Sequence, residues 1–123
     1  MQKHSHVTPA GRAFWYTERL WRLAEGLPVF SVPIDSIPEF DQNCWFTTPP
    51  TCREVAEHAR RIMAADLSFP IILSADGRLM DGGHRLARAW LEGREEVPAR
   101  RFEQDPDPDF VDPMGAVKGT AHG

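Results

Sequence analysis

The segment over residues 75–93 constrains this chain more than any other. Asp76-Gly77 is a tight-turn signal between two short apolar runs at 71–73 and 79–80, which predicts a β-hairpin. The second strand of that hairpin leads directly into a helical pattern that ends at Gly93. The sequence therefore predicts a strand, a tight turn, a second strand and a helix within about twenty residues.

Two glycines, Gly82 and Gly83, stand between this strand and this helix, so the first backbone N–H groups of the helix are unobstructed. His84 and Arg85 follow in the first turn, where a basic side chain opposes the helix dipole unless an anion is bound. The pattern predicts a phosphate-binding helix N-terminus, with the Arg85 side chain facing outward. The simpler alternative is an ordinary turn followed by a solvated arginine.

The candidate ligand-binding residues of this motif are Asp81, Gly82, Gly83, His84, Arg85 and Arg88. Backbone N–H groups and the Arg85 guanidinium would hold phosphate oxygens, with Arg88 as a second cation. Two assignments stay open: His84 either donates to phosphate or caps the hairpin, and Asp81 either holds Mg²⁺ or caps the helix.

Periodicity places the other elements. We expect a helix that Thr17 caps, with an apolar side of Leu20, Leu23, Ala24 and Leu27; an edge strand over 29–34; a central strand over 69–74; and a last strand over 97–102. A capping box at 51–54 opens a further helix, expected to bury Val55, Ala59, Ile62 and Met63. The glycine-led helix should bury Leu86, Ala87, Trp90 and Leu91.

The two ends of the chain are expected to be less ordered than its middle. Residues 1–12 are expected to be flexible, and residues 104–123 to form an acidic, Pro- and Gly-rich flexible tail. Net charge is −4, and after Phe102 the acidic residues outnumber the one lysine, Lys118. The remaining body is close to neutral, which argues against direct binding to a nucleic-acid backbone.

Cys44 and Cys52 are too few for a disulfide framework or a zinc site, and we expect free thiols in a reducing compartment. The N-terminus has no apolar signal region and no long apolar run occurs, so we expect a cytoplasmic protein without membrane contact. The irregular segment over 35–50 mixes carboxylates with large aromatic residues. Long ordered loops are often functional, although Trp45 and Phe46 can simply anchor this one.

The order of elements and four short motifs resemble the ParB/sulfiredoxin-like superfamily over residues 28–103. The similar motifs are Ile34-Asp-Ser-Ile-Pro38 after the first strand, Pro70-Ile71-Ile72 after a helix, Gly82-Gly83-His84-Arg85 as a Gly-x-x-Arg turn, and Val97-Pro98 in the last strand. The resemblance implies one α+β domain over residues 13–103, a small mixed sheet with packed helices, and phosphate contacts from the Gly-x-x-Arg turn.

Departures from the superfamily narrow the expected function. Gly83 stands where sulfiredoxins place a reactive cysteine, so that repair reaction lacks its nucleophile. Partition proteins carry Gly-Glu-Arg-Arg here, followed by a DNA-reading domain that we do not find, so we do not expect a stand-alone centromere-binding role. The motif at residues 81–85 is most similar to that of free-serine-kinase-like members, which have Asp-Gly-His-His-Arg at this place. In that branch a carboxylate after the first strand acts as base, which here implies Glu39, with Asp35 and Asp41 as rivals.

Three functions therefore remain open. The first is a small phosphotransferase or nucleotide hydrolase that uses ATP, ADP or CTP, with Mg²⁺, and a base such as Glu39. The second is a nucleotide-sensing module that recruits a protein partner through the loop at 39–46. The third is a nucleic-acid-associated ParB-type nuclease or partition-related domain, which the neutral body disfavours.

Overall fold

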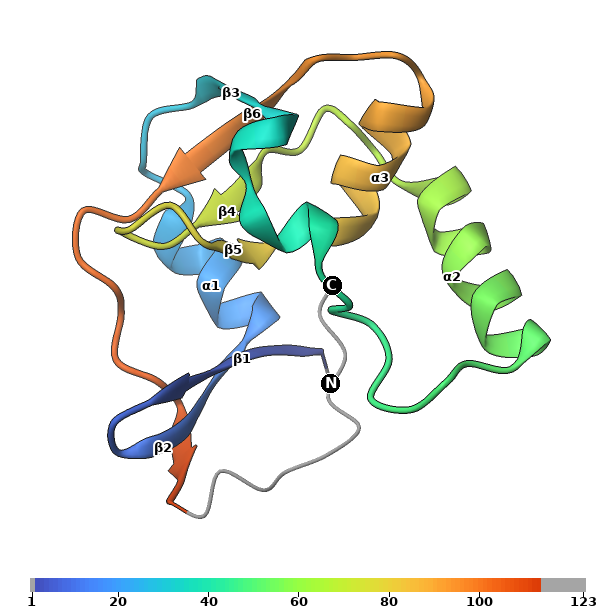
Figure 1. Cartoon of the computed structure of the whole chain (residues 1–123). Coiled ribbons are helices and arrows are strands. Elements are labelled where there is room, and N and C mark those ends of the chain that lie inside the picture. Colours follow the sequence, from blue (N-terminus) through green and yellow to red (C-terminus); the bar gives the residue numbers. More distant parts are fainter. Residues whose placement is uncertain (1, 114–123) are drawn as a thin grey trace.

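The computed structural model describes residues 2–113, which form an α+β fold of three α-helices and two small sheets (Figure 1). The strands are β1 (Lys3–Thr8), β2 (Gly11–Tyr16), β3 (Phe30–Pro33), β4 (Ile71–Leu73), β5 (Leu79–Asp81), β6 (Glu96–Arg101) and β7 (Phe110–Asp112). The helices are α1 (Thr17–Ala24), α2 (Cys52–Ala64) and α3 (Gly83–Leu91), with short 3₁₀ turns η1 (Ile34–Ser36) and η2 (Pro38–Asp41).

The larger sheet is mixed and has the strand order β3-β6-β4-β5. β3 pairs antiparallel with β6, β4 runs parallel to β6, and β4 and β5 form the antiparallel hairpin predicted around Asp76-Gly77. β3 is an edge strand and tolerates Pro33 at its end, as expected. β4 is interior and fully buried, which confirms the central strand predicted from its continuous apolar run.

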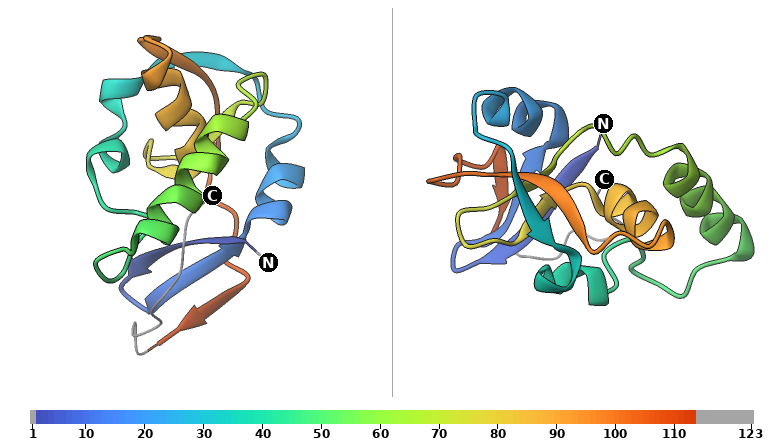
Figure 2. Two further views of the ribbon diagram at one scale, coloured as in Figure 1. Left: turned by 90° about the vertical axis from the view of Figure 1, so that its right-hand side faces the viewer. Right: turned by 90° about the horizontal axis from the view of Figure 1, so that it is seen from above.

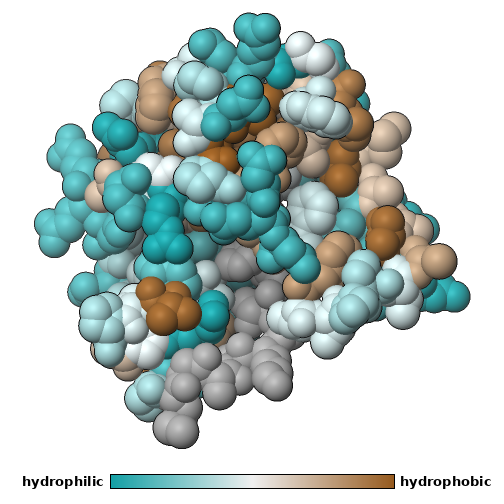
Figure 3. Space-filling model, in the orientation of Figure 1, coloured by the Kyte–Doolittle hydropathy of each residue, from teal (hydrophilic) through white to brown (hydrophobic). Residues whose placement is uncertain are grey.

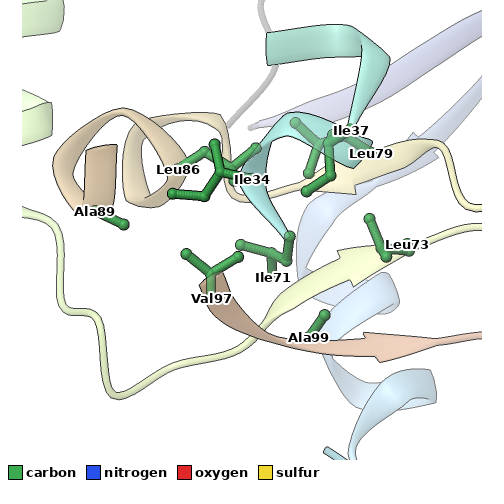
Figure 4. Close-up of a cluster of buried hydrophobic side chains, with 9 residues drawn as sticks. All are labelled: Ile34, Ile37, Ile71, Leu73, Leu79, Leu86, Ala89, Val97 and Ala99. Carbon is green, nitrogen blue, oxygen red and sulfur yellow. The ribbon is translucent and has the colours of Figure 1, made fainter. Parts of the chain in front are cut away.

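Side chains of β4 alternate between two hydrophobic clusters on the two faces of this sheet. Ile71 and Leu73 belong to the cluster under α3 and the 3₁₀ turns, which Figure 4 shows with all nine of its buried members. Ile72 belongs to the second cluster, which Leu20 of α1 and Trp15 of β2 complete. α1 is therefore packed between the mixed sheet and the strands of the second sheet (Figure 1).

The second sheet corrects two predicted boundaries. Residues 3–12, expected to be flexible, lie in the β1–β2 hairpin, and residues 110–112, expected to be tail, form β7 against β2. Trp15 Nε1 donates to the Pro106 carbonyl oxygen at 2.8 Å, and the Asp109 carboxylate accepts from the backbone N–H of Tyr16 at 2.8 Å. These hydrogen bonds order the acidic segment around residues 106–109, which its composition alone did not predict. The rest of the predicted tail, residues 114–123, lies outside the described residues.

α2 begins with the predicted capping box, in which Thr51 and Glu54 satisfy each other's backbone N–H groups. The expectation that α2 buries an apolar face is wrong, because none of its residues is buried and Val55 and Met63 are exposed. α2 lies on the outer side of α3, away from the sheet (Figure 2). Space-filling Figure 3 shows apolar surface over this pair of helices.

Two further sequence expectations about helices fail. The side chain of Thr17 makes no capping bond, and α1 begins after Tyr16 instead. On α3, Leu86 and Ala89 are buried, whereas Trp90 is 57% exposed and Leu91 is exposed. None of the described helices is long and apolar enough to cross a membrane.

The two leucines of α1 give a matched test of the core. Leu20 is fully buried, so Leu20→Ala should lower the free energy of unfolding by about 2–5 kcal/mol through lost contacts and a cavity. Leu23 lies on the same helix but is 46% exposed, so Leu23→Ala should change it by less than about 0.5 kcal/mol. Urea denaturation of both variants measures the difference. Equal losses would contradict the orientation of α1.

Candidate functional site

Residues of the turn from β5 into α3 line two different cavities. The first, here called the Glu39 cavity, has a volume of about 410 Å³ and is lined by residues from β1, η2 and its following loop, β5, α2 and α3: His4, Ser5, His6, Glu39, Phe40, Gln42, Asn43, Cys44, Trp45, Ile62, Arg78, Leu79, Met80, Gly83, Leu86, Ala87, Trp90 and Leu91. The second, the Arg85 cavity, has a volume of about 790 Å³. It is lined by Gln2, Trp21, Arg22, Ala24, Glu25, Arg61, Ala65, Asp66, Phe69, Pro70, Ile72, Asp81, Gly82, His84, Arg85 and Arg100.

Gly82 is required at this turn for two reasons. Its φ of 117° lies in the left-handed region, and a Cβ atom there would stand 2.5 Å from Cγ2 of Ile71. This close approach lets α3 begin directly after β5. No described residue accepts a hydrogen bond from the backbone N–H groups of Gly83, His84 or Arg85, so the predicted bare helix N-terminus is present.

Asp81 is buried and joins α1 to α3. Its Oδ2 atom accepts a hydrogen bond from Trp21 Nε1 at 2.6 Å and a charge-assisted one from Arg85 Nη2. The alternative in which Asp81 caps α3 is wrong, because no side chain caps this helix. Within residues 2–113, no group of three or more His, Cys, Asp or Glu side chains is placed to hold a metal ion.

Arg85 does not face outward as the sequence suggested. Besides its ion pair with Asp81, its Nη1 atom donates to the carbonyl oxygen of Pro70 at 2.8 Å. The Asp81 carboxylate therefore offsets the cost of placing a cation at the N-terminus of α3. The sequence analysis expected a bound anion to do this. Arg85 still lines the cavity, although much of its hydrogen-bonding capacity is used within the protein.

His84 lies in a stack of rings that connects α3 to α2. Its Nε2 atom is 2.8 Å from Nδ1 of His58, and Trp45 stacks on both imidazoles with centroid distances of 4.6 and 4.8 Å. Burial, the neighbouring His58 and the cations of Arg61 and Arg85 lower the pKa of His84 to about 4. At neutral pH His84 is therefore uncharged, and one imidazole donates to the other.

Glu39 lines the other cavity. Its Oε1 atom accepts a hydrogen bond from the backbone N–H of Leu79 at 2.7 Å, and its Oε2 atom is 4.0 Å from Nε of Arg78. Gly83 of the predicted motif lines this cavity as well. The structure thus brings Glu39 near the glycine turn but on the opposite side from Gly82, His84 and Arg85.

The remaining candidate residues lie apart from both cavities. Asp35 lines a separate hollow beside Glu95 and Glu96, and Asp41 is exposed at the end of η2. Arg88 donates from Nε to Glu92 at 2.9 Å and from Nη1 to the carbonyl oxygen of Met63, so it connects α3 to α2.

Sequence reasoning missed several residues of these cavities. The sequence did contain a hairpin signal at Thr8-Pro-Ala-Gly11, which lies between a histidine-containing stretch and an aromatic one. That hairpin brings His4 and His6 to the Glu39 cavity. Nothing local in the sequence pairs Trp21 with Asp81 or His58 with His84, because 60 and 26 residues separate them. Comparisons with protein-family models, with curated proteins and with solved structures find no match to this chain.

The His58–His84 pair predicts that acid destabilises the fold. A pKa of about 4 in the folded state lies below the unfolded value of 6.5, so unfolding takes up protons between these values. The stabilising contribution of neutral His84 is complete above pH 6.5 and is lost as the pH falls toward 4. We expect the free energy of unfolding to drop by about 2–3 kcal/mol between pH 7 and pH 4.5, measured by urea denaturation.

His84→Asn provides the control for this loss, because it removes the titrating imidazole. The variant should be less stable at pH 7 but should lose less stability on acidification than the wild type. An identical pH dependence in both proteins would assign the acid sensitivity to other groups.

Proposed function

We propose that this chain is a ParB/sulfiredoxin-like domain that binds the phosphate groups of a nucleotide, or of a phosphorylated small molecule, in the Arg85 cavity. The observation that carries the proposal is the uncapped N-terminus of α3, whose first N–H groups have no acceptor among the described residues and whose first turn lines a large cavity. Such helix ends favour phosphate through both hydrogen bonding and the helix dipole.

The charges around the cavity support an anionic ligand. Arg22 and Arg61 line it from α1 and α2, and neither forms a salt bridge within residues 2–113. Arg85 and Asp81 offset each other, whereas Glu25 and Asp66 work against an anion. Phosphate would therefore rely on backbone N–H groups together with Arg22 and Arg61, with Arg85 behind them.

Aromatic side chains at the same cavity suit a nucleobase. Trp21 and Phe69 are exposed and line the Arg85 cavity from two different segments. A flat base can stack on such rings with little dependence on its identity, which fits ATP, ADP and CTP alike. Mg²⁺ would enter with the phosphates of the nucleotide.

The placement of Glu39 favours a binding module over a phosphotransferase or hydrolase. A general base must come within hydrogen-bond reach of the proton that it removes, and Glu39 opens onto the opposite cavity. In the binding-module version, the loop at 39–46 would contact a protein partner when nucleotide is bound. The catalytic version needs a rearrangement of the β5–α3 turn that brings Glu39 to the phosphates.

Two neighbouring arginines of α2 test phosphate binding. Arg61 lines the Arg85 cavity whereas Arg60, exposed on the same helix, does not. Arg61→Gln should weaken ATP or CTP binding by about 1.5 kcal/mol, the lower end for a hydrogen bond between charged groups, and Arg60→Gln should leave it unchanged. Titration calorimetry measures both. Equal affinities in the two variants, or no binding of ATP, ADP, CTP or pyrophosphate by the wild type, would contradict the proposal.

The catalytic version has its own test. If Glu39 acts as general base, Glu39→Gln should retain nucleotide affinity while turnover falls by about 10²–10⁴-fold. Asp35→Asn and Asp41→Asn are the matched controls, assayed with radiolabelled nucleotide and a panel of hydroxyl acceptors. Unchanged turnover in all three variants would remove this version, and a wild type without turnover would leave the binding module.

A further inference from the structure

The Glu39 cavity has three aromatic walls. Phe40, Trp45 and Trp90 line it from η2, the following loop and α3. The rings of Phe40 and Trp90 are 6.2 Å apart between centroids and inclined at 54°, so they form two sides of a corner. Trp45 is held by its stacking on His58 and His84. Trp90 is more than half exposed, so its ring contributes little to the core and is available to a ligand.

Glu39 is the one carboxylate among the residues that line this cavity, and its Oε2 atom is in an ion pair with Arg78 but accepts no hydrogen bond within the described residues. The hydrogen bond from Leu79 occupies Oε1 of Glu39, and Oε2 stands 4.0 Å from Nε of Arg78, beyond hydrogen-bond distance. The Glu39 side chain is only 13% exposed, whereas that of Arg78 is 48% exposed. The carboxylate therefore acts inside the cavity, where it is weakly screened, and the guanidinium extends toward water.

Two further titratable groups that line the cavity, His6 and Cys44, are uncharged at pH 7. Burial and the nearby Arg78 lower the pKa of His6, so its imidazole is neutral at pH 7. The carboxylates of Asp105 and Asp76 partly oppose this lowering of the His6 pKa, and the guanidinium of Arg12 adds to it. Burial and Glu39 raise the pKa of the Cys44 thiol, which keeps it uncharged. Arg78 is the one arginine or lysine among the described residues that line this cavity.

We propose that the Glu39 cavity binds a small organic ammonium ion, with its charged head between the aromatic rings and the Glu39 carboxylate. The faces of aromatic rings attract cations, and alkylated ammonium groups are favoured because they give up their hydration more readily than metal ions. Leu79, Met80 and Leu86 line the same cavity and offer apolar contacts for methyl groups. A volume of about 410 Å³ holds a molecule of the size of choline.

Choline and two compounds of the same shape test the charge preference. 3,3-Dimethyl-1-butanol replaces the trimethylammonium group of choline by a neutral tert-butyl group, and 3,3-dimethylbutanoate carries a negative charge. We expect choline to bind at least tenfold more tightly than either analogue, measured by NMR titration of the tryptophan indole resonances at pH 7.5. Equal binding of choline and the alcohol would overturn the proposal, as would tighter binding of the carboxylate or no choline binding at all.

Substitutions of Glu39 and Arg78 should change choline affinity in opposite directions, which distinguishes direct effects on the ligand from loss of structure. Glu39→Gln keeps an oxygen for Leu79 but removes the negative charge, and should weaken choline binding about tenfold. Arg78→Gln removes the opposing cation and should strengthen it about two- to threefold. Trp90→Leu should weaken it about three- to tenfold, with little change in thermal stability since the ring is exposed. Losses of the same size in all three variants would indicate a collapsed cavity and contradict the proposal.

A peptide containing trimethyl-lysine distinguishes the source of the ammonium group. Tighter binding of this peptide than of choline would identify a modified protein tail as the ligand, and the reverse would identify a free metabolite. Measured without nucleotide or phosphate, choline affinity should be unchanged in Arg61→Gln, because Arg61 lines the Arg85 cavity and not the Glu39 cavity.

Discussion

The arrangement of this domain depends on the hydrogen bond and the ion pair that the buried carboxylate of Asp81 makes. An isolated charge is too costly to bury, so Asp81 needs both Trp21 from α1 and Arg85 from α3. Arg85 in turn donates to the backbone just before β4. One carboxylate thus fixes two helices and the central strand relative to each other. Because it points to these partners, it does not cap α3, and the N-terminus of that helix stays open.

The same short turn determines that the protein has two cavities of different character. Gly82 packs directly on Ile71 and lines the Arg85 cavity, whereas the next residue, Gly83, lines the Glu39 cavity. On one side are arginines, an open helix end and exposed aromatic rings, which favour a phosphorylated ligand. On the other are a carboxylate, the neutral imidazole of His6 and indole rings, which favour a cation. The charges of the two proposed ligands are opposite, so neither should compete for the other's cavity.

Local signals predicted the middle of the fold well. The Asp76-Gly77 hairpin, the capping box at Thr51, the edge position of Pro33 and the helix after Gly83 were all readable, because each depends on a few neighbouring residues. The α+β class, which the resemblance implied, is confirmed. The finer ParB/sulfiredoxin-like assignment stays a proposal that rests on the sequence motifs.

Burial and long-range pairing were harder to predict. Apolar periodicity in α2 and at Trp90 was assigned to the core, but periodicity marks an apolar face without showing what covers it. The role of Arg85 was misread because its partner is buried by tertiary packing with Trp21, which no local pattern encodes. The acidic segment was expected to be flexible, but the backbone N–H of Tyr16 in the N-terminal hairpin and the guanidinium of Arg19 give the Asp109 carboxylate its partners.

Helix α2 should unfold locally, independently of the rest of the domain. No residue of α2 is buried, and it is held by the His58–His84 hydrogen bond, the stacking of Trp45 and the bond from Arg88 to Met63. Elements with so little buried surface open at a free energy well below that of global unfolding, and their amide hydrogens exchange accordingly. Ile62 lines one cavity and Arg61 the other, so one opening event removes a wall from both. A ligand in either cavity would slow amide exchange along α2 and would favour occupation of the other cavity, through the stability of this helix alone.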